Sequence, residues 1–403
     1  MSKRLFLFTA RYPYVGVENF LEDEILLLSS KFDEVVVVPY KRTDFGCREM
    51  PNNCRLELPI VGGKLDFLTK ALYNKALFPK LIREFCERKV YCSIQRMKVW
   101  LTGYAAANSI SNSSIVKSIG SGLKNDDVCY FYWGKWSNVL SVLWKGRAHF
   151  VSRFHGQWDL WEEEYDGYTP LRKHVSQALD AAVFISEKGA RYFHEHYPDC
   201  DATVFRLGTK DIGTVKGSED GKIRILSCST VYSLKRVDLI LKSVAEVAKT
   251  KDIEWTHLGG GEDYETIKDM AEKMKNEHLN VNMPGQMLYS EVLEYYKSHT
   301  FDIFINLSTN EGIPVSIMEA ISLDVPVVAT NVGGTGEIVN DETGKLVNEN
   351  PTPKEVAQAI VAVFDNRLQY RPREFWLQNY VAEKNYTKFA MFLASLTNGT
   401  QVI

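Results

Sequence analysis

Short apolar runs bounded by polar, glycine-bearing turns recur along this 403-residue chain. Runs rich in Val, Ile, Leu and Phe without alternation are typical of strands buried on both faces, as in a parallel sheet. Most of them are followed by segments with helical spacing of apolar residues. The pattern therefore predicts an α/β protein with two Rossmann-like domains. The expected strands are residues 3–9, 35–39, 127–132, 148–154, 181–186 and 203–207 in the first half, and 223–228, 255–258, 279–283, 303–307 and 325–329 in the second.

A polar segment separates the two halves. Residues 208–222 (GTKDIGTVKGSEDGK) contain glycines and charges but few apolar residues, which is the composition of a linker. We therefore expect a first domain over 1–207 and a second over 223–370. Residues 371–403 form a C-terminal segment with roughly helical spacing.

Composition and charge limit the possible functions. The net charge of −3 gives no reason to expect nucleic acid as a partner, and 45% hydrophobic with 25% charged residues is typical of a globular protein. Seven cysteines without a C-x-x-C pair favour a reducing cytosol over a disulfide framework. The apolar run at residues 5–10 is too short for a secretory signal, so we expect a cytoplasmic protein.

The most informative stretch is residues 302–347, which predicts a strand, a loop, a helix, a second strand and a glycine turn. Pro314 suits the first turn of the helix, where a missing N–H has no consequence. The start of a helix carries unbonded amides and about half a positive charge, so the turn Gly312-Ile313-Pro314-Val315 is a predicted anion site. Glu311 precedes this turn and Glu319 lies further along the helix. A nucleotide sugar fits this arrangement, with its pyrophosphate at the helix start and its hydroxyls on the two carboxylates.

The motifs EGIPVSIMEA, PVVAT, VGG and EIV within this stretch resemble the E-x7-E signature of glycosyltransferase family 4. The resemblance implies the GT-B fold, with two domains facing each other across a cleft and a C-terminal helix that crosses back to the first domain. It also implies retaining transfer from a nucleotide-diphosphate sugar, with UDP or GDP, and no cofactor. No metal is expected, because the helix start and a lysine would replace it. The resemblance covers the second half of the chain well and the first half loosely.

Further donor-binding residues are expected on the loops of the second half. The family carries an arginine and, five residues later, a lysine at the donor pyrophosphate; here Lys235 matches the lysine but Thr230 stands in place of the arginine. Arg236 is a weaker candidate for the same task. Gly259 and Gly260 belong to a glycine turn that lets a backbone approach a ligand. Met287 lies, by position only, where the family touches the nucleobase.

In the first half the resemblance points to two loops. Gly16 matches the loop that meets the donor, and His155, next to a glycine after a strand, matches a histidine near the transferred sugar. Glu311, Lys235 and His155 are thus the predicted catalytic residues. Aromatic and acidic residues follow His155, and Trp158, Trp161 and Tyr165 are the candidates for stacking on an acceptor sugar.

Residues 64–100 contain nine basic and three acidic residues together with several aromatic ones. Such a segment can lie on an anionic membrane surface, which would place the protein peripherally on the inner face of the membrane. An amphipathic helix packed on the sheet, with its basic face in water, explains the same pattern equally well.

The predicted function is transfer of a sugar from a nucleotide-sugar donor to a glycan or lipid-linked acceptor in cell-surface polysaccharide or glycolipid assembly. Two alternatives remain open at this point. One is a nucleotide-sugar epimerase or phosphorylase of similar fold, which would not need an acceptor. The other is a non-catalytic module that binds nucleotide sugars, and Thr230 is the feature in its favour.

Overall fold

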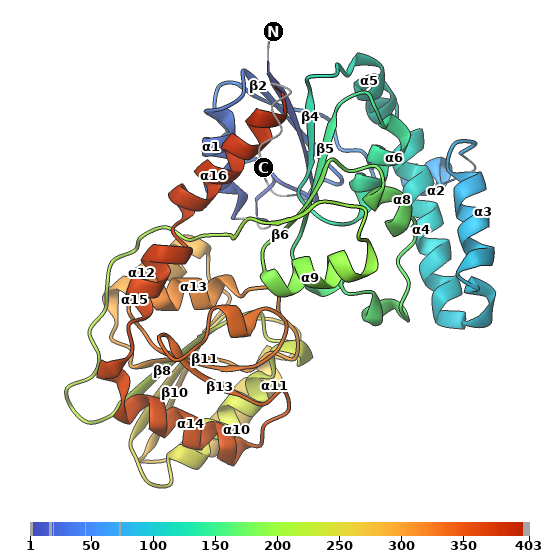
Figure 1. Cartoon of the computed structure of the whole chain (residues 1–403). Helices are drawn as coiled ribbons and strands as arrows, with labels where there is room; N and C mark the ends of the chain where they lie inside the picture. Colours follow the sequence, from blue (N-terminus) through green and yellow to red (C-terminus); the bar gives the residue numbers. More distant parts are fainter. Residues whose placement is uncertain (1–2, 16–17, 19, 45, 72–73, 398–403) are drawn as a thin grey trace. The chain divides into compact units, whose positions relative to one another are not determined.

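The computed structural model describes residues 3–15, 18, 20–44, 46–71 and 74–397. The chain divides into two compact units (Figure 1). Unit 1 contains residues 1–205 and 386–403, and unit 2 contains residues 206–385. Each unit is built on its own parallel sheet, which confirms the predicted α/β class.

Unit 1 has a seven-stranded sheet in the order β3-β2-β1-β4-β5-β6-β7. Its strands are β1 (Arg4–Thr9), β2 (Glu34–Pro39), β3 (Cys54–Leu56), β4 (Val128–Phe131), β5 (His149–Phe154), β6 (Ala181–Phe184) and β7 (Ala202–Val204). Its helices are α1 (Leu21–Ser29), α2 (Lys64–Lys70), α3 (Phe78–Glu87), α4 (Ile94–Asn112), α5 (Ser114–Gly122), α6 (Leu140–Trp144), α7 (Gln157–Leu160), α8 (Arg172–Ser176) and α9 (Glu187–His196). The edge strand β3 was not predicted, because its three residues are only partly buried or exposed.

The apolar runs form this sheet because both of its faces are covered. In β2, Val35 and Val37 face a core shared with α1, whereas Val36 and Val38 face a core shared with α4 and α5. Successive side chains of a strand point to opposite faces, so a strand buried on both sides has no polar alternation. Figure 1 shows α1 and α16 (Ala382–Leu396) on one side of the sheet and α5 and α6 on the other.

The C-terminal helix α16 enters the core of unit 1. Phe389 and Leu393 are fully buried against β1, β4 and α1. The Arg153 guanidinium lies 4.1 Å from the Phe389 ring centroid, and its Nη1 donates to Glu24 Oε2 at 2.6 Å. This ion pair is fully buried, so removal of either partner would leave an uncompensated charge in the core. The predicted return of the C-terminal helix to the first domain is confirmed.

Unit 2 has a six-stranded sheet in the order β10-β9-β8-β11-β12-β13. Its strands are β8 (Ile223–Cys228), β9 (Ile253–Leu258), β10 (Leu279–Gly285), β11 (Ile303–Asn306), β12 (Val327–Thr330) and β13 (Gly344–Val347). Its helices are α10 (Val237–Val247), α11 (Tyr264–Met274), α12 (Tyr289–Ser298), α13 (Val315–Ser322), α14 (Pro353–Asp365) and α15 (Pro372–Asn379). Because β8 pairs with β11, the loops that follow these two strands lie at the same edge of the sheet.

The segments predicted as a linker and as the start of the C-terminal segment both lie in unit 2. Thr209 forms a bridge with Val381, and its hydroxyl accepts a hydrogen bond from the indole of the fully buried Trp376. The chain therefore joins unit 1 only from Tyr386 onward, fifteen residues after the expected start of that segment at 371. Within the described part of the chain, no helix is both long and apolar enough to span a bilayer.

Candidate active site

The loop after β11 and the start of α13 form the centre of the candidate site. Glu311 is 6% exposed. Its Oε1 accepts hydrogen bonds from Ser308 Oγ at 2.6 Å and from Lys235 Nζ at 2.5 Å. Lys235 comes from the loop after β8, which the pairing of β8 with β11 brings alongside. Two residues to which the sequence assigned separate roles thus form one ion pair, with Ser308 as an additional partner.

The start of α13 is open to an anion. The helix begins at Val315. Pro314, expected in the first turn, lies immediately before the helix with an extended backbone (φ −67°, ψ 121°). Among the described residues, no side chain caps the helix. The first amides of a helix have no acceptor within it, so the N–H groups of Val315 and Ser316 are available to a negatively charged group.

The V-G-G turn after β12 supports the Glu311 loop. Gly333 has a φ of +51°, and a Cβ at this position would come within 1.6 Å of the Glu311 carbonyl oxygen. The Gly334 amide donates to the Gly312 carbonyl at 2.8 Å. Only glycine allows this approach, which explains why the glycine turn accompanies the Glu311 loop in the sequence motif.

Glu319 lies in the second turn of α13 and is 4% exposed. Its carboxylate accepts hydrogen bonds from Tyr289 Oη at 2.9 Å and Tyr296 Oη at 3.3 Å, both on α12. Burial raises the pKa of Glu319 to about 7, although the two hydroxyls oppose this shift. Glu319 therefore changes charge near neutral pH. Its predicted contact with the ribose stays a prediction.

Arg236 holds the loops together. Its backbone is left-handed (φ 48°), and its guanidinium donates to the carbonyl oxygens of Leu307 at 2.5 Å and Ser308 at 3.0 Å. Burial lowers its pKa from the ordinary value. Its predicted contact with the donor stays a prediction, but Lys235 is the cation that lies against Glu311.

The glycine turn after β9 packs against the loop that leads to Lys235. A Cβ on Gly259, whose φ is +135°, would come within 2.0 Å of the Ser229 carbonyl oxygen. The Gly260 carbonyl accepts the Val231 amide at 2.9 Å. The close backbone approach at these glycines is made by the neighbouring loop after β8. The predicted contact of Gly259 and Gly260 with the donor stays a prediction. Met287, in the loop before α12, is half-buried.

His155 follows β5 in unit 1. Its ring centroid lies 4.8 Å from that of Tyr132 and 4.3 Å from that of Trp133. Its backbone amide donates to Asp159 Oδ1 at 3.0 Å, and its Nδ1 is 3.5 Å from Asp159 Oδ2. Among the described residues, neither ring nitrogen has a partner within hydrogen-bond distance, although the ring is largely buried. The ring is thus oriented by its neighbours while its hydrogen-bonding capacity is unused.

Tryptophans near His155 form a row, which we call the aromatic row: Trp133, Trp158 and Trp136. Trp158 lies 4.9 Å from Trp133 and 5.0 Å from Trp136, measured between ring centroids. Of the predicted acceptor residues, Trp158 is part of the row and Tyr165 lies under Lys135, whose Nζ is 3.7 Å from the ring centroid. Trp161 instead packs on Tyr192 of α9, with centroids 4.8 Å apart.

Glu18 was missed by the sequence reasoning. Its carboxylate accepts the backbone amides of Arg11 and Tyr12, both at 2.6 Å, and the indole N–H of Trp133, also at 2.6 Å. It therefore fixes both the loop after β1 and one end of the aromatic row. Gly16, predicted on the same loop, lies outside the described residues.

The architecture of the two units is that of a GT-B protein. The chain is similar over 97% of its length to the lipopolysaccharide outer core galactosyltransferase WaaB in its apo form, with a TM-score of 0.67, 14% identity and 99% of that chain covered. It is similar over 98% of its length to Anabaena Alr3699/HepE in complex with UDP, with a TM-score of 0.64, 13% identity and 100% coverage. At these identities the likeness shows the fold, and it confirms the predicted GT-B class.

The sequence likeness is concentrated in unit 2. Residues 209–378 match the family model described as Glycosyl transferases group 1. The chain is 29% identical over 166 residues to the O-antigen biosynthesis glycosyltransferase WbnH of Escherichia coli, which is 40% of this chain and 44% of the relative. It is 26% identical over 159 residues to the alpha-monoglucosyldiacylglycerol synthase of Streptococcus pneumoniae, 39% of this chain and 35% of the relative. The chain thus matches less than half the length of these relatives.

Proposed function

We propose that this protein is a glycosyltransferase that moves a sugar from a nucleotide-diphosphate sugar to a glycan or lipid-linked acceptor during assembly of a cell-surface glycan. The observation that carries the proposal is the Lys235–Glu311 ion pair beside the uncapped start of α13. A carboxylate, an ammonium group and free helix amides meet there within the residues that match the family model. The relatives in O-antigen and glycolipid synthesis support the kind of product.

The mechanism follows from where charge develops. When the bond between the anomeric carbon and the diphosphate oxygen breaks, negative charge grows on the departing diphosphate. The amides at the start of α13 and the Lys235 ammonium stabilise this charge, which is the electrostatic effect that usually dominates catalysis. Glu311 holds hydroxyls of the donor sugar, and Glu319 holds the ribose. These groups make a metal unnecessary, and transfer proceeds with retention of configuration.

The first domain supplies the acceptor side of the reaction in this proposal. His155 offers its ring nitrogens to the sugars, and the aromatic row offers flat apolar faces. Sugar rings present C–H faces that stack on aromatic side chains, while their hydroxyls need hydrogen-bond partners. The donor nucleotide is UDP or GDP, and the UDP complex of HepE, which has the same fold, favours UDP.

The proposal is tested by nucleotide binding to wild type and Lys235→Met, measured by isothermal titration calorimetry with UDP and GDP. We expect one diphosphate to bind and the variant to bind it about tenfold to a hundredfold more weakly, since a charge-assisted hydrogen bond is lost. Lys242→Met is the matched control, because Lys242 is an exposed lysine on α10 paired only with Asp238 across one turn. Equal affinity in wild type and Lys235→Met would disprove the assignment of Lys235.

A non-catalytic module that binds nucleotide sugars is the second candidate. Thr230, exposed on the loop after β8, stands where the resembling family has a phosphate-binding arginine. This candidate predicts diphosphate binding without any transfer. Incubation with a UDP-sugar and extracted cell-surface glycolipid separates the two, because only the transferase forms a labelled product that depends on the acceptor.

We also propose that helices α2, α3 and α4 contact the membrane peripherally. Their outer surface exposes large apolar side chains, among them Leu65 at 76%, Ile94 at 71% and Leu101 at 58%. Exposed apolar residues among lysines and arginines suit an anionic lipid surface. The inner face of α4 packs on the core of unit 1 through Trp100, Ala107 and Ile110, and the membrane contact is proposed for its outer face.

A further inference from the structure

A cavity of about 220 Å³ lies in unit 1 between α4 and residues 165–175. One face of α4 forms a wall through Val99, Thr102 and Ala106, which are spaced three and four residues apart. The volume is far above the roughly 10–15 Å³ that one water molecule requires. The cavity is therefore large enough for part of a ligand.

The cavity combines apolar walls with positive charge. Val139, Leu171 and Val175 line it together with Val99 and Ala106, and Lys135 and Arg172 are the charged residues among the described part of its lining. No Asp or Glu is among the described residues that line it. Apolar walls beside two cations suit a ligand that carries an anionic group on an apolar chain.

Arg172 adds an independent observation. This residue is 3% exposed, and its Nη2 donates to the Asp159 carbonyl at 2.8 Å. Its Nη1 has no hydrogen-bond partner among the described residues. A buried donor of a charged group is costly to leave unpaired, so an anionic oxygen at this end of the cavity would satisfy it.

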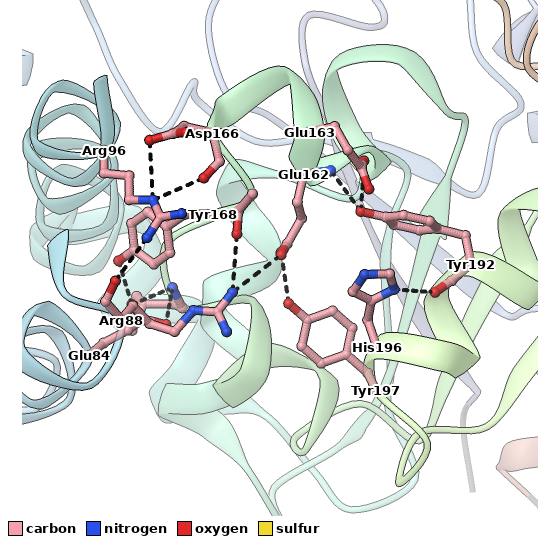
Figure 2. Close-up of polar contacts among 12 residues, drawn as sticks. Glu84, Arg88, Arg96, Glu162, Glu163, Asp166, Tyr168, Tyr192, His196 and Tyr197 are labelled. Atoms are coloured by element: carbon pink, nitrogen blue, oxygen red, sulfur yellow. Dashed lines mark hydrogen bonds and ion pairs between the residues drawn. The ribbon is translucent and has the colours of Figure 1, made fainter. Parts of the chain in front are cut away.

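Hydrogen bonds hold the wall opposite α4 in place, and those to Glu84 are buried (Figure 2). Arg96 Nε donates to the Asp166 carbonyl at 2.9 Å, and Arg88 Nη2 donates to the Gly167 carbonyl at 3.2 Å. Glu84 Oε2 accepts Tyr168 Oη and the Leu171 amide, both at 2.9 Å. Residues on α3 and α4 thus tether the segment that closes the cavity, which makes it a built feature of the fold.

The cavity adjoins the aromatic row. Trp136 lines the cavity and lies 5.0 Å from Trp158, and the row continues from there through Trp133 to His155. Lys135 lies 5.7 Å from the Trp158 ring centroid as well as over Tyr165. A molecule with a phosphate at Lys135 would therefore reach the aromatic row with one end and the apolar cavity with the other.

We propose that this cavity binds the phosphate and the first carbons of an amphiphilic acceptor, in which a phosphate joins a sugar or alcohol to an apolar chain. Lys135 and Arg172 hold the phosphate, and the α4 wall contacts the chain. The inference rests on the proposed function and names the acceptor class of unit 1.

The test is isothermal titration calorimetry of the full chain with octyl phosphate, below its micelle concentration. Octanol and inorganic phosphate are the comparison ligands. We expect octyl phosphate to bind at least about tenfold more tightly than either, because it alone satisfies both the apolar and the charged parts of the cavity. Lys135→Gln should weaken its binding about tenfold, while Lys117→Gln, an exposed charge on α5, should not.

Filling the cavity provides the second arm. Ala106→Phe should abolish binding of octyl phosphate, and Thr102→Phe, at an exposed lining position, repeats the test if the first variant does not fold. Leu101→Phe is the control on the same helix, since Leu101 is exposed outside the lining. Equal affinity for octyl phosphate and octanol, or for octyl phosphate and inorganic phosphate, would overturn the proposal. So would unchanged binding in a folded cavity-filling variant.

The same samples are titrated with UDP and GDP. Binding of the diphosphate should be equal in wild type and in every cavity variant, because the site at α13 belongs to unit 2. Octyl phosphate binding without any diphosphate binding would refute the proposed function but leave the cavity as an anion-amphiphile site. Diphosphate binding without octyl phosphate binding would refute the cavity assignment alone.

Discussion

Glu311 and Glu319 stand on one short segment, yet their surroundings prepare them for different tasks. Glu311 forms an ion pair with Lys235 and accepts a hydrogen bond from the Ser308 hydroxyl. Glu319 accepts hydrogen bonds from the hydroxyls of Tyr289 and Tyr296, and burial raises its pKa to about 7. A ligand that donates two hydroxyls to Glu319 would stabilise its charged form.

Substitution should separate these two tasks. Glu319→Ala is expected to weaken UDP binding about tenfold to a hundredfold, because hydrogen bonds from the ribose to a carboxylate are lost. Glu311→Ala should retain nucleotide affinity while sugar transfer falls by at least about a hundredfold. Calorimetry and a transfer assay measure the two effects, and Glu277→Ala on the surface is the control. Unchanged nucleotide affinity in Glu319→Ala would show that the ribose assignment is wrong.

At the scale of elements, α4 serves two surfaces at once. Its inner residues join the core, whereas Ile94 and Leu101 are separated by two helical turns and lie on the outer surface. We expect wild type to sediment with vesicles that contain phosphatidylglycerol and to remain in solution with pure phosphatidylcholine. The double variant Ile94→Ser with Leu101→Ser should lose most of this binding, because two exposed apolar side chains that would insert into the bilayer are removed.

Leu368→Ser is the control for that experiment, since Leu368 is 83% exposed in unit 2. The membrane contact is excluded if the double variant binds as wild type does, or if phosphatidylcholine binds as well as phosphatidylglycerol. Weaker binding at high salt would identify the share contributed by the basic residues.

Strands and helices were easier to predict than the contacts between side chains of different elements. The strands were readable because parallel strands buried on both faces leave continuous apolar runs, and the start of α13 was readable from its proline and glycines. The contact of Lys235 with Glu311 was not, because it depends on the pairing of β8 with β11 across 76 positions of sequence. Trp161 shows the same limit: sequence placed it beside Trp158, but a short helical turn directs it to α9.

One local signal was available and was missed. Tyr289 and Tyr296 are seven residues apart, so they lie on one face of α12, and both donate to Glu319. The sequence could not identify Glu319 as the hydrogen-bond acceptor of these tyrosines, since α12 and α13 are brought together only by the fold. The aromatic row, the proposed acceptor side, was the hardest to predict because it joins loops after β4 and β5.

At the scale of the whole molecule, two buried groups in unit 2 make stability respond to pH in opposite directions. Burial lowers the pKa of His257 to about 4. Ser227 Oγ lies 2.8 Å from its Nδ1, and the Ser229 carbonyl lies 3.2 Å from its Nε2, so the ring is held as the neutral Nε2–H tautomer. Unfolding restores a pKa near 6.5 to His257, so between about pH 4 and 6.5 the unfolded chain binds a proton that the folded chain does not. The contribution of His257 to the free energy of unfolding is therefore lost as pH falls through this range.

The pH dependence of stability that Glu319 causes has the opposite sign. Its pKa is about 7 when folded and near 4.5 when unfolded, so the folded protein binds the extra proton and stability is lost as pH rises from about 4.5 to 7. Each shift corresponds to about 3 kcal/mol, so the two contributions largely cancel over this range. We expect Glu319→Gln to gain stability relative to wild type as pH rises from 4.5 to 7, and His257→Gln to lose stability relative to wild type over the same range.

Urea unfolding at several pH values measures both differences. A variant whose pH profile of stability runs parallel to that of wild type would contradict the pKa shift assigned to the residue it replaces. Because the hydrogen bonds of a bound ribose favour the charged carboxylate, saturating UDP should reduce the pH-dependent difference that Glu319 causes, which ties the destabilisation of the empty protein to the function of the site.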